Sequence, residues 1–185
     1  MFDISVQTQT GLVQVFYGDG RGKTSAAMGE VWQAVSQGLR VCAVFFMKGK
    51  RWEAEYNILE KLQVEYTVFG RSGFLSSADT QAEDSKLCRQ ALEFAEGQIR
   101  SGKWDLVVLD EINNAQYYGF ILARDILKLL SAKPVGTSLI LTGKVVDKAV
   151  AEEVNLIDEC CKVKHPYDRG ILARQYRLLK MSKSR

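Results

Sequence analysis

Short apolar runs alternate with longer amphipathic stretches along most of the chain. The clearest runs have four to seven residues and predict strands; they are Leu12–Tyr17, Val41–Met47, Val64–Phe69, Leu106–Leu109 and Ser138–Thr142. A weaker run covers residues 156–163. Several runs are apolar at consecutive positions, so both faces of the strand would be buried, as in a parallel sheet covered by helices.

The stretches between these runs carry apolar residues three or four positions apart, which predicts amphipathic helices. The predicted helices cover Thr24–Gln37, Asn57–Leu62, Asp79–Arg100 and a region from Leu122 that ends before Pro134, and a shorter one begins near Asp147. The regular alternation of strand and helix predicts an α/β fold, in which a mostly parallel sheet is flanked by helices on both faces.

The composition fits one globular domain. Of the 185 residues, 46% are hydrophobic and 25% are charged, which excludes collagen, a coiled coil and global disorder. No apolar run approaches the roughly 18 residues of a membrane span, and the first residues lack the basic start and apolar core of a signal peptide. We therefore expect a single cytoplasmic domain over residues 1–185, with no membrane partner and with residues 1–10 and 177–185 as candidates for flexible ends.

The net charge of +3 is too small to indicate binding to nucleic acid. The charge is unevenly distributed, because the last twelve residues hold five basic side chains and no acidic one. This basic end is either a solvated tail or a contact for phosphate or another acidic ligand. The four cysteines form no Cys-x-x-Cys pair and the chain has one histidine, so we expect a reducing compartment and no zinc site.

The segment after the first predicted strand has the composition of a phosphate-binding loop. Its eight residues are Gly18, Asp19, Gly20, Arg21, Gly22, Lys23, Thr24 and Ser25. Glycines let backbone N–H groups surround an anion, and the following helix directs its positive dipole end at that anion. Lys23 would supply charge for the outer phosphates, and the Thr24 hydroxyl suits Mg²⁺. Tyr17 stands where the common pattern has glycine, so a glycine-rich turn with a chance Gly-Lys-Thr is the alternative.

Two acidic residues, Asp110 and Glu111, follow the apolar run Leu106–Leu109. At the carboxyl edge of a parallel sheet they would lie near the phosphate loop and hold Mg²⁺ together with Thr24. Alone, the pair would more simply be two solvated acids at a strand end; the phosphate loop favours the metal site. The residues therefore predict a Mg²⁺–ATP site, and the usual chemistry of such a site is cleavage or transfer of the γ-phosphate by an ATPase or kinase.

The loop, preceded by a residue other than glycine, resembles that of the P-loop corrinoid adenosyltransferases, which act on cob(I)alamin or cob(I)yrinic acid a,c-diamide. Further segments resemble this family in the same order; they are Ala26–Gly29, Phe46–Gly49, Gly73–Phe74, Val107–Glu111, Leu141–Gly143 and Val163–Tyr167, with Glu55 and Gly170. The resemblance spans residues 11 to about 173, which is nearly the whole chain.

This resemblance implies a RecA-like P-loop fold and an unusual reaction. In the family, the Co(I) of a reduced corrinoid attacks the 5′ carbon of ATP, and inorganic triphosphate leaves. The resemblance implies Mg²⁺ and a corrinoid co-substrate, an electron-donating reductase and a homodimer. It implies that Lys23 and the loop hold the triphosphate, that Glu111 is the preferred direct Mg²⁺ ligand, and that Phe74 closes the corrinoid face and keeps the lower axial ligand away from cobalt.

The chain departs from the family pattern at several positions, and three single substitutions among them would affect contacts with the phosphates or the corrinoid. Ser76 replaces a tryptophan, Gln33 replaces an arginine of the first helix, and Lys144 replaces the arginine of Thr-Gly-Arg, which keeps a positive charge for the phosphates without the guanidinium fork. Phosphoryl transfer with ADP as product, and nucleotide binding without turnover, stay as alternative functions. The natural corrinoid is left open, and His165 is expected to be structural rather than a cobalt ligand.

Overall fold

The apolar runs form the strands of one sheet. The computed structural model describes residues 10–49, 54–71 and 78–164. The strands are β1 (Val13–Tyr17), β2 (Val41–Phe46), β3 (Glu65–Phe69), β4 (Leu106–Asp110), β5 (Ser138–Thr142) and β6 (Leu156–Glu159). They lie in the order β3-β2-β4-β5-β1-β6, and every neighbouring pair is parallel. The predicted α/β class is therefore confirmed, with an entirely parallel sheet.

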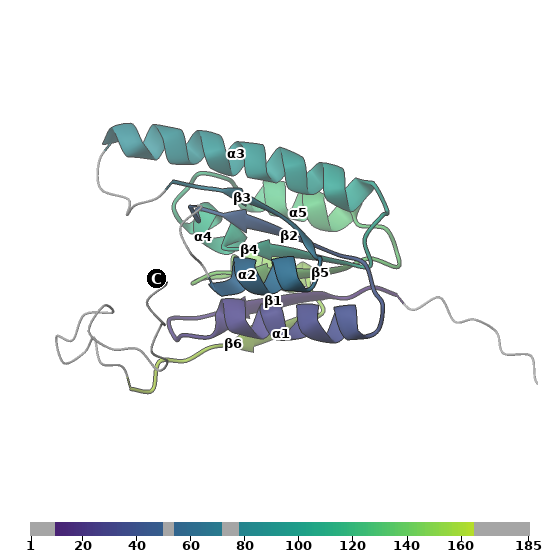
Figure 1. The fold of residues 1–185 in the computed structure, drawn as a ribbon. Coiled ribbons are helices and arrows are strands. Elements are labelled where there is room, and N and C mark those ends of the chain that lie inside the picture. Colours follow the sequence, from purple (N-terminus) through teal and green to yellow (C-terminus); the bar gives the residue numbers. More distant parts are fainter. Residues whose placement is uncertain (1–9, 50–53, 72–77, 165–185) are drawn as a thin grey trace, which may run out of the picture.

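Helices cover both faces of this sheet (Figure 1). They are α1 (Lys23–Ser36), α2 (Ala54–Lys61), α3 (Ala78–Arg100), α4 (Ile112–Tyr117), α5 (Ala123–Ala132) and α6 (Lys148–Glu153). The helices α1 and α2 pack on one face, and α3 to α6 pack on the other. None of the helices within the described ranges is long and apolar enough to cross a bilayer.

The central strands are buried on both sides because each face has its own helical layer. In β2, Val41, Ala43 and Phe45 face the α1–α2 core, and the alternate positions of the strand face the α3–α6 core. Cys42 of β2 and Cys88 of α3 lie in the latter core, where burial raises the pKa of each thiol to about 12. Both cysteines therefore serve as apolar core residues.

The pattern located most elements and missed one. The short helix α4 was not predicted, because its sequence Ile-Asn-Asn-Ala-Gln-Tyr has no apolar periodicity, yet Ile112, Asn113 and Ala115 are buried. The prediction for the last strand was too long, since β6 ends at Glu159 rather than near residue 163. Just beyond β6, the Cys160 N–H donates to the Tyr17 carbonyl and the Cys160 carbonyl accepts from the Gly20 N–H, so the chain there contacts the loop after β1.

A parallel sheet brings the carboxyl ends of its strands to one edge. The phosphate loop follows β1, Lys48 comes two residues after β2, Asp110 ends β4 and Thr142 ends β5. These segments are distant along the chain, and β2, β4, β5 and β1 are consecutive in the sheet. The fold therefore gathers the candidate site residues at this edge.

Candidate nucleotide site

The phosphate loop is held from both sides by other parts of the chain. The Gly18 N–H donates to the carbonyl of Lys144 at 3.1 Å, and the Gly20 N–H donates to the carbonyl of Cys160 at 2.7 Å. A Cβ atom added to Gly18 or Gly20 would lie 2.5 Å from the Cys160 carbonyl oxygen. Glycine is thus required at both positions because another backbone passes so close.

Lys23 opens α1, directly after Gly22, which has a left-handed backbone with φ of 112°. Its Nζ donates to the carbonyl oxygens of Gly18 and Gly20 at 2.8 and 2.7 Å. The ammonium therefore lies across its own loop, beside the N-terminal end of the helix. Both features place positive charge where the sequence predicted a phosphate group.

Asp110 is the centre of a buried polar cluster. Its side chain is fully buried, and its Oδ1 accepts a hydrogen bond from the Thr142 hydroxyl at 2.7 Å. The Thr142 hydroxyl oxygen also accepts from the Glu111 N–H at 2.8 Å. The end of β5 thus positions both acidic residues at the end of β4, a role that the sequence alone did not reveal for Thr142.

Lys48 joins this cluster from the chain just after β2. Its Nζ lies 2.6 Å from Asp110 Oδ2 and 3.3 Å from Thr24 Oγ1. Burial by itself lowers the pKa of Lys48, but the charges of Asp110, and then of Glu111 and Glu55, outweigh this effect and raise it. Lys48 therefore carries a positive charge in the site. The sequence signal for Lys48 was a basic residue just beyond a fully apolar strand. At the level of the sequence, Lys48 was noted only as part of Phe46–Gly49, one of the segments that resemble the family.

Glu111 is the residue directly before α4 and has a left-handed conformation with φ of 64°. Burial, and next the charge of Asp110, raise the pKa of the Glu111 carboxyl, while Lys48, Lys23 and a hydrogen bond from Asn114 oppose the rise. Asn114 Nδ2 donates to Glu111, and Asn114 Oδ1 accepts from the Lys144 N–H at 2.6 Å. Since Lys144 also accepts from Gly18, Asn114 connects the acidic pair to the phosphate loop; it was not predicted as a site residue.

Comparisons with known proteins identify the family of this chain. The family model of the ATP:corrinoid adenosyltransferase BtuR/CobO/CobP matches residues 9–176. The chain belongs to this family. It is 31% identical over 168 residues to a corrinoid adenosyltransferase of Escherichia coli (strain K12), a match that covers 91% of this chain and 85% of the relative. A corrinoid adenosyltransferase of Salmonella typhimurium is 30% identical over the same shares of the two chains, and one of Sinorhizobium sp is 31% identical over 90% of this chain and 79% of the relative.

Several of the site residues predicted for an adenosyltransferase meet at one edge of the sheet; they are the loop, Lys23, Thr24, Asp110 and Glu111. Asp19 is turned toward the chain after β6, because its carboxylate accepts from the Lys162 N–H at 3.0 Å. Arg21 and Ser25 are exposed. Lys144 is also exposed; its Nζ lies 6.0 Å from the centroid of the Tyr117 ring, and its backbone, rather than its charge, contacts the loop. Phe74, Ser76 and His165 lie outside the described residues.

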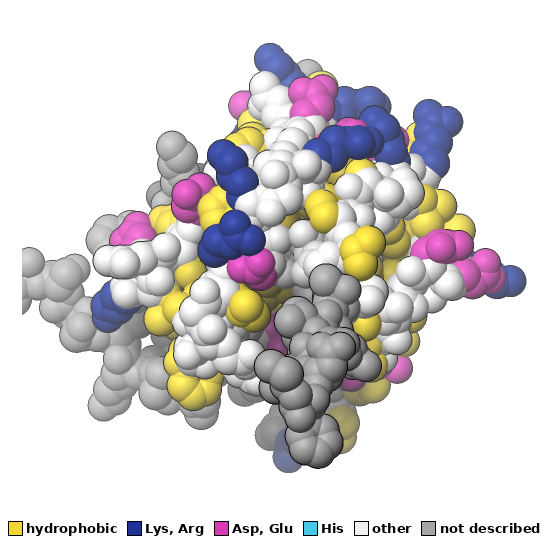
Figure 2. Space-filling view, turned by 90° about the vertical axis from the view of Figure 1, so that its right-hand side faces the viewer, with side chains coloured by type: hydrophobic (Ala, Val, Ile, Leu, Met, Phe, Trp, Pro, Cys, Tyr) yellow, Lys and Arg dark blue, Asp and Glu magenta, His cyan; other side chains and the backbone are white. Residues whose placement is uncertain are grey.

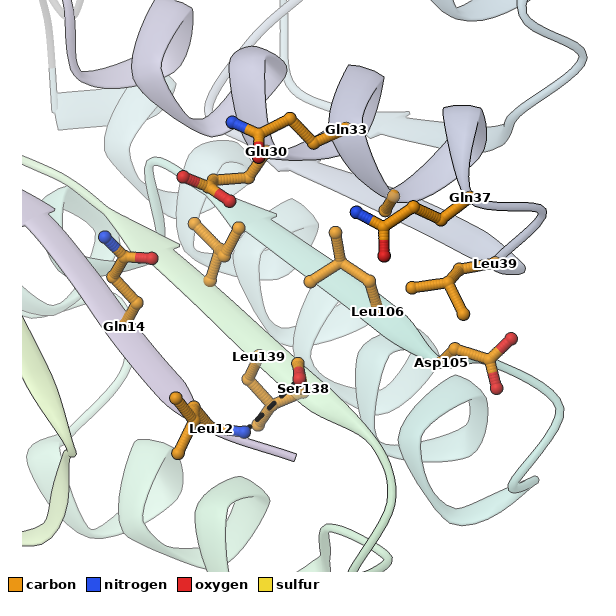
Figure 3. A pocket seen from close by; sticks show the side chains of 12 residues that line it. Leu12, Gln14, Glu30, Gln33, Gln37, Leu39, Asp105, Leu106, Ser138 and Leu139 are labelled. Atoms are coloured by element: carbon orange, nitrogen blue, oxygen red, sulfur yellow. Dashed lines mark hydrogen bonds between the residues drawn. The ribbon is translucent and has the colours of Figure 1, made fainter. Parts of the chain in front are cut away.

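Gln33, which replaces the arginine of other family members, does not point at the phosphate loop. It lines a groove between α1 and the amino-terminal ends of the strands, together with Leu12 and Asp105 (Figure 3). Figure 2 views the molecule from the side of these amino-terminal ends, where basic, acidic and apolar side chains are interspersed. The departure at Gln33 therefore lies away from the carboxyl edge that carries the nucleotide site.

Proposed function

We propose that the protein transfers the 5′-deoxyadenosyl group of ATP to the Co(I) centre of a reduced corrinoid. The electron pair of Co(I) forms the bond to the 5′ carbon, the bond from that carbon to the triphosphate oxygen breaks, and inorganic triphosphate leaves with the electrons of that bond. The observation that carries this proposal is the phosphate loop beside the Asp110–Lys48–Thr24 cluster, in a chain whose match to the family covers residues 9–176.

The described residues suit a leaving group rather than a general base. Lys23 and the first N–H groups of α1, which have no acceptor within the helix, would stabilise the charge that builds on the departing triphosphate. Lys48 would add a second ammonium at the same edge. Because Co(I) already carries the attacking electron pair, the reaction needs positioning and exclusion of water more than proton transfer.

We infer that Mg²⁺ accompanies the nucleotide. A hydroxyl and two carboxylates, from Thr24, Asp110 and Glu111, are the hard oxygen ligands that this ion prefers. Both oxygens of Asp110 already have partners, so Glu111 is the better direct ligand and Asp110 would act through water. Within the described ranges no three acidic, histidine or cysteine side chains cluster as a metal site, so phosphate oxygens and water would complete the shell. Bound Mg²⁺ would shield the negative charge of the triphosphate.

The remaining parts of the proposal come from the family. Phe74 would close the corrinoid face, an electron-donating reductase would supply Co(I), and the chain would act as a homodimer. We also propose a cytoplasmic setting; the state of all four cysteines as free thiols supports a reducing compartment. Lys144 would approach the phosphates only if its side chain left the Tyr117 ring.

A product assay tests the proposed function. The protein is mixed with Mg²⁺–ATP and chemically reduced cobalamin without oxygen, and the products are separated. We expect light-sensitive adenosylcobalamin and inorganic triphosphate in equal amounts. A parallel reaction omits the cobalamin. ADP and phosphate formed in that reaction would instead establish phosphoryl transfer, and ATP left unchanged with and without cobalamin would indicate a protein that binds the nucleotide without turnover.

A further inference from the structure

Lys48 reaches the site through a local feature of the backbone. Met47, directly after β2, has a left-handed conformation with φ of 56°, which redirects the chain before Lys48. Strands β2 and β4 are neighbours in which Phe45 lies opposite Asp110. The Lys48 Nζ is 5.4 Å from the centroid of the Phe45 ring, so the aromatic face supports the ammonium from one side.

The ammonium then lies between two oxygen ligands from different elements. It is 2.6 Å from Asp110 Oδ2 and 3.3 Å from Thr24 Oγ1, and the Lys48 side chain is 16% exposed. A fully buried carboxylate is unstable without a nearby positive charge. Lys48 supplies that charge to Asp110 from inside the protein, before any nucleotide binds.

The same two oxygens define where a metal ion would sit in a P-loop site. In such sites the Thr or Ser of the loop and the acidic residue at the end of a neighbouring strand hold Mg²⁺ between them. Two cations cannot share one gap of this size, so the ammonium and a metal ion between Thr24 and Asp110 exclude each other.

We propose that Lys48 is a positioning residue whose ammonium takes the place of a metal ion between Thr24 and Asp110. It keeps these two groups in the geometry that the triphosphate needs. It also narrows the Mg²⁺ ligands proposed above to Glu111, because the ammonium already lies between the oxygens of Thr24 and Asp110. The inference rests on the phosphate-binding part of the proposed function, but not on the corrinoid reaction. This role differs from that of a lysine in an ordinary buried ion pair, because a metal ion would not restore stability after such a pair is lost.

The test is metal rescue of Lys48→Met. Thermal unfolding is measured without nucleotide, in EDTA and in increasing Mg²⁺, and ATP affinity is measured by calorimetry in both conditions. We expect that Mg²⁺ alone leaves the melting temperature of the parent unchanged but raises that of the variant. In EDTA the variant should bind ATP about tenfold more weakly than the parent, as expected when one member of a buried charge pair is lost, and Mg²⁺ should restore most of that loss.

Two further proteins sharpen this test. Lys148→Met removes a lysine whose side chain is 92% exposed, and it should behave like the parent in every measurement. The double variant Lys48→Met/Asp110→Asn removes both charges, and Mg²⁺ alone should not stabilise it. The proposal is overturned if Mg²⁺ alone stabilises the parent, a result that does not depend on any variant folding, or if Lys48→Met is as insensitive to Mg²⁺ as the parent. Neither result would bear on adenosyl transfer, which the product assay decides.

Discussion

The Gly20 N–H donates to the Cys160 carbonyl at 2.7 Å, and this bond joins the phosphate loop to the chain that leaves β6. Gly20 follows β1, Cys160 follows β6, and the two strands are neighbours at one side of the sheet. The contact leaves no room for a side chain on Gly20. The shape of the loop therefore depends on a segment about 140 residues further along the chain.

Gly20→Ala should damage the loop. The added Cβ would lie 2.5 Å from the Cys160 carbonyl oxygen, so one of the two segments must move. We expect a lower melting temperature and ATP binding weakened about tenfold or more, in line with the cost of overpacking. The control is Gly97→Ala in α3, where a Cβ meets nothing within 4 Å and alanine favours the helix. A loss of stability and affinity equal in the two variants would contradict this interpretation.

Lys23→Ala should abolish measurable ATP binding. The variant loses the ammonium that lies across the loop, and with it the hydrogen bonds to Gly18 and Gly20. Calorimetric titration with Mg²⁺–ATP measures the affinity, and far-ultraviolet circular dichroism verifies that the variant is folded. Lys148→Ala, at an exposed position of α6, is the matched control. Near-parental affinity in a folded Lys23→Ala protein would refute the assignment of the phosphate loop.

Thr142→Val should destabilise the protein and disturb the site together. Valine keeps the shape but removes the hydroxyl that donates to Asp110 and accepts from the Glu111 N–H. We expect the free energy of unfolding to fall by about 1–3 kcal/mol, the cost of leaving buried polar groups unpaired, and ATP affinity to fall as well. Thr137→Val removes another buried hydroxyl, which donates to the Trp104 carbonyl, and it should lower stability without changing ATP affinity. Unchanged affinity in Thr142→Val would make its hydroxyl purely structural.

The pH dependence of stability should reveal Glu111. Burial, and then Asp110, raise the pKa of Glu111 above its ordinary value of 4.5, so the folded protein holds this proton more tightly than the unfolded chain. The resulting stabilisation is complete below pH 4.5 and is lost as pH rises through the raised pKa. The Glu111→Gln variant has no carboxyl here and does not lose this stabilisation. Its free energy of unfolding should therefore rise relative to that of the parent as pH increases through this window, and the difference should persist at higher pH. Urea unfolding without Mg²⁺, between about pH 4 and pH 8, measures the difference; parallel curves would contradict the prediction.

Phe74→Ala should affect the corrinoid step but not ATP binding. If this side chain closes the corrinoid face, the variant keeps parental ATP affinity but forms less adenosylcobalamin, chiefly when the reaction starts from Co(II) with a reductase. Rates with chemically prepared Co(I) should change less, because the reduction step is then bypassed. Equal rates for variant and parent from Co(II) would remove Phe74 from the corrinoid step.

The sequence by itself located most of the elements and the phosphate-binding part of the site. Apolar runs located the strands, and the order of glycines, lysine and threonine located the phosphate loop, since both depend on residues close together along the chain. The acidic pair after Leu106–Leu109 was readable for the same reason. The family resemblance was also carried by such local segments.

The tertiary structure alone decided which distant groups complete the site. The contacts of Lys48 with Asp110, of Asn114 with Lys144 and of Cys160 with Gly20 join residues that no periodicity relates. They depend on the strand order β3-β2-β4-β5-β1-β6, which determines the strand ends that meet at the carboxyl edge. Strand order arises from the packing of whole layers, so a pattern read along the chain does not contain it.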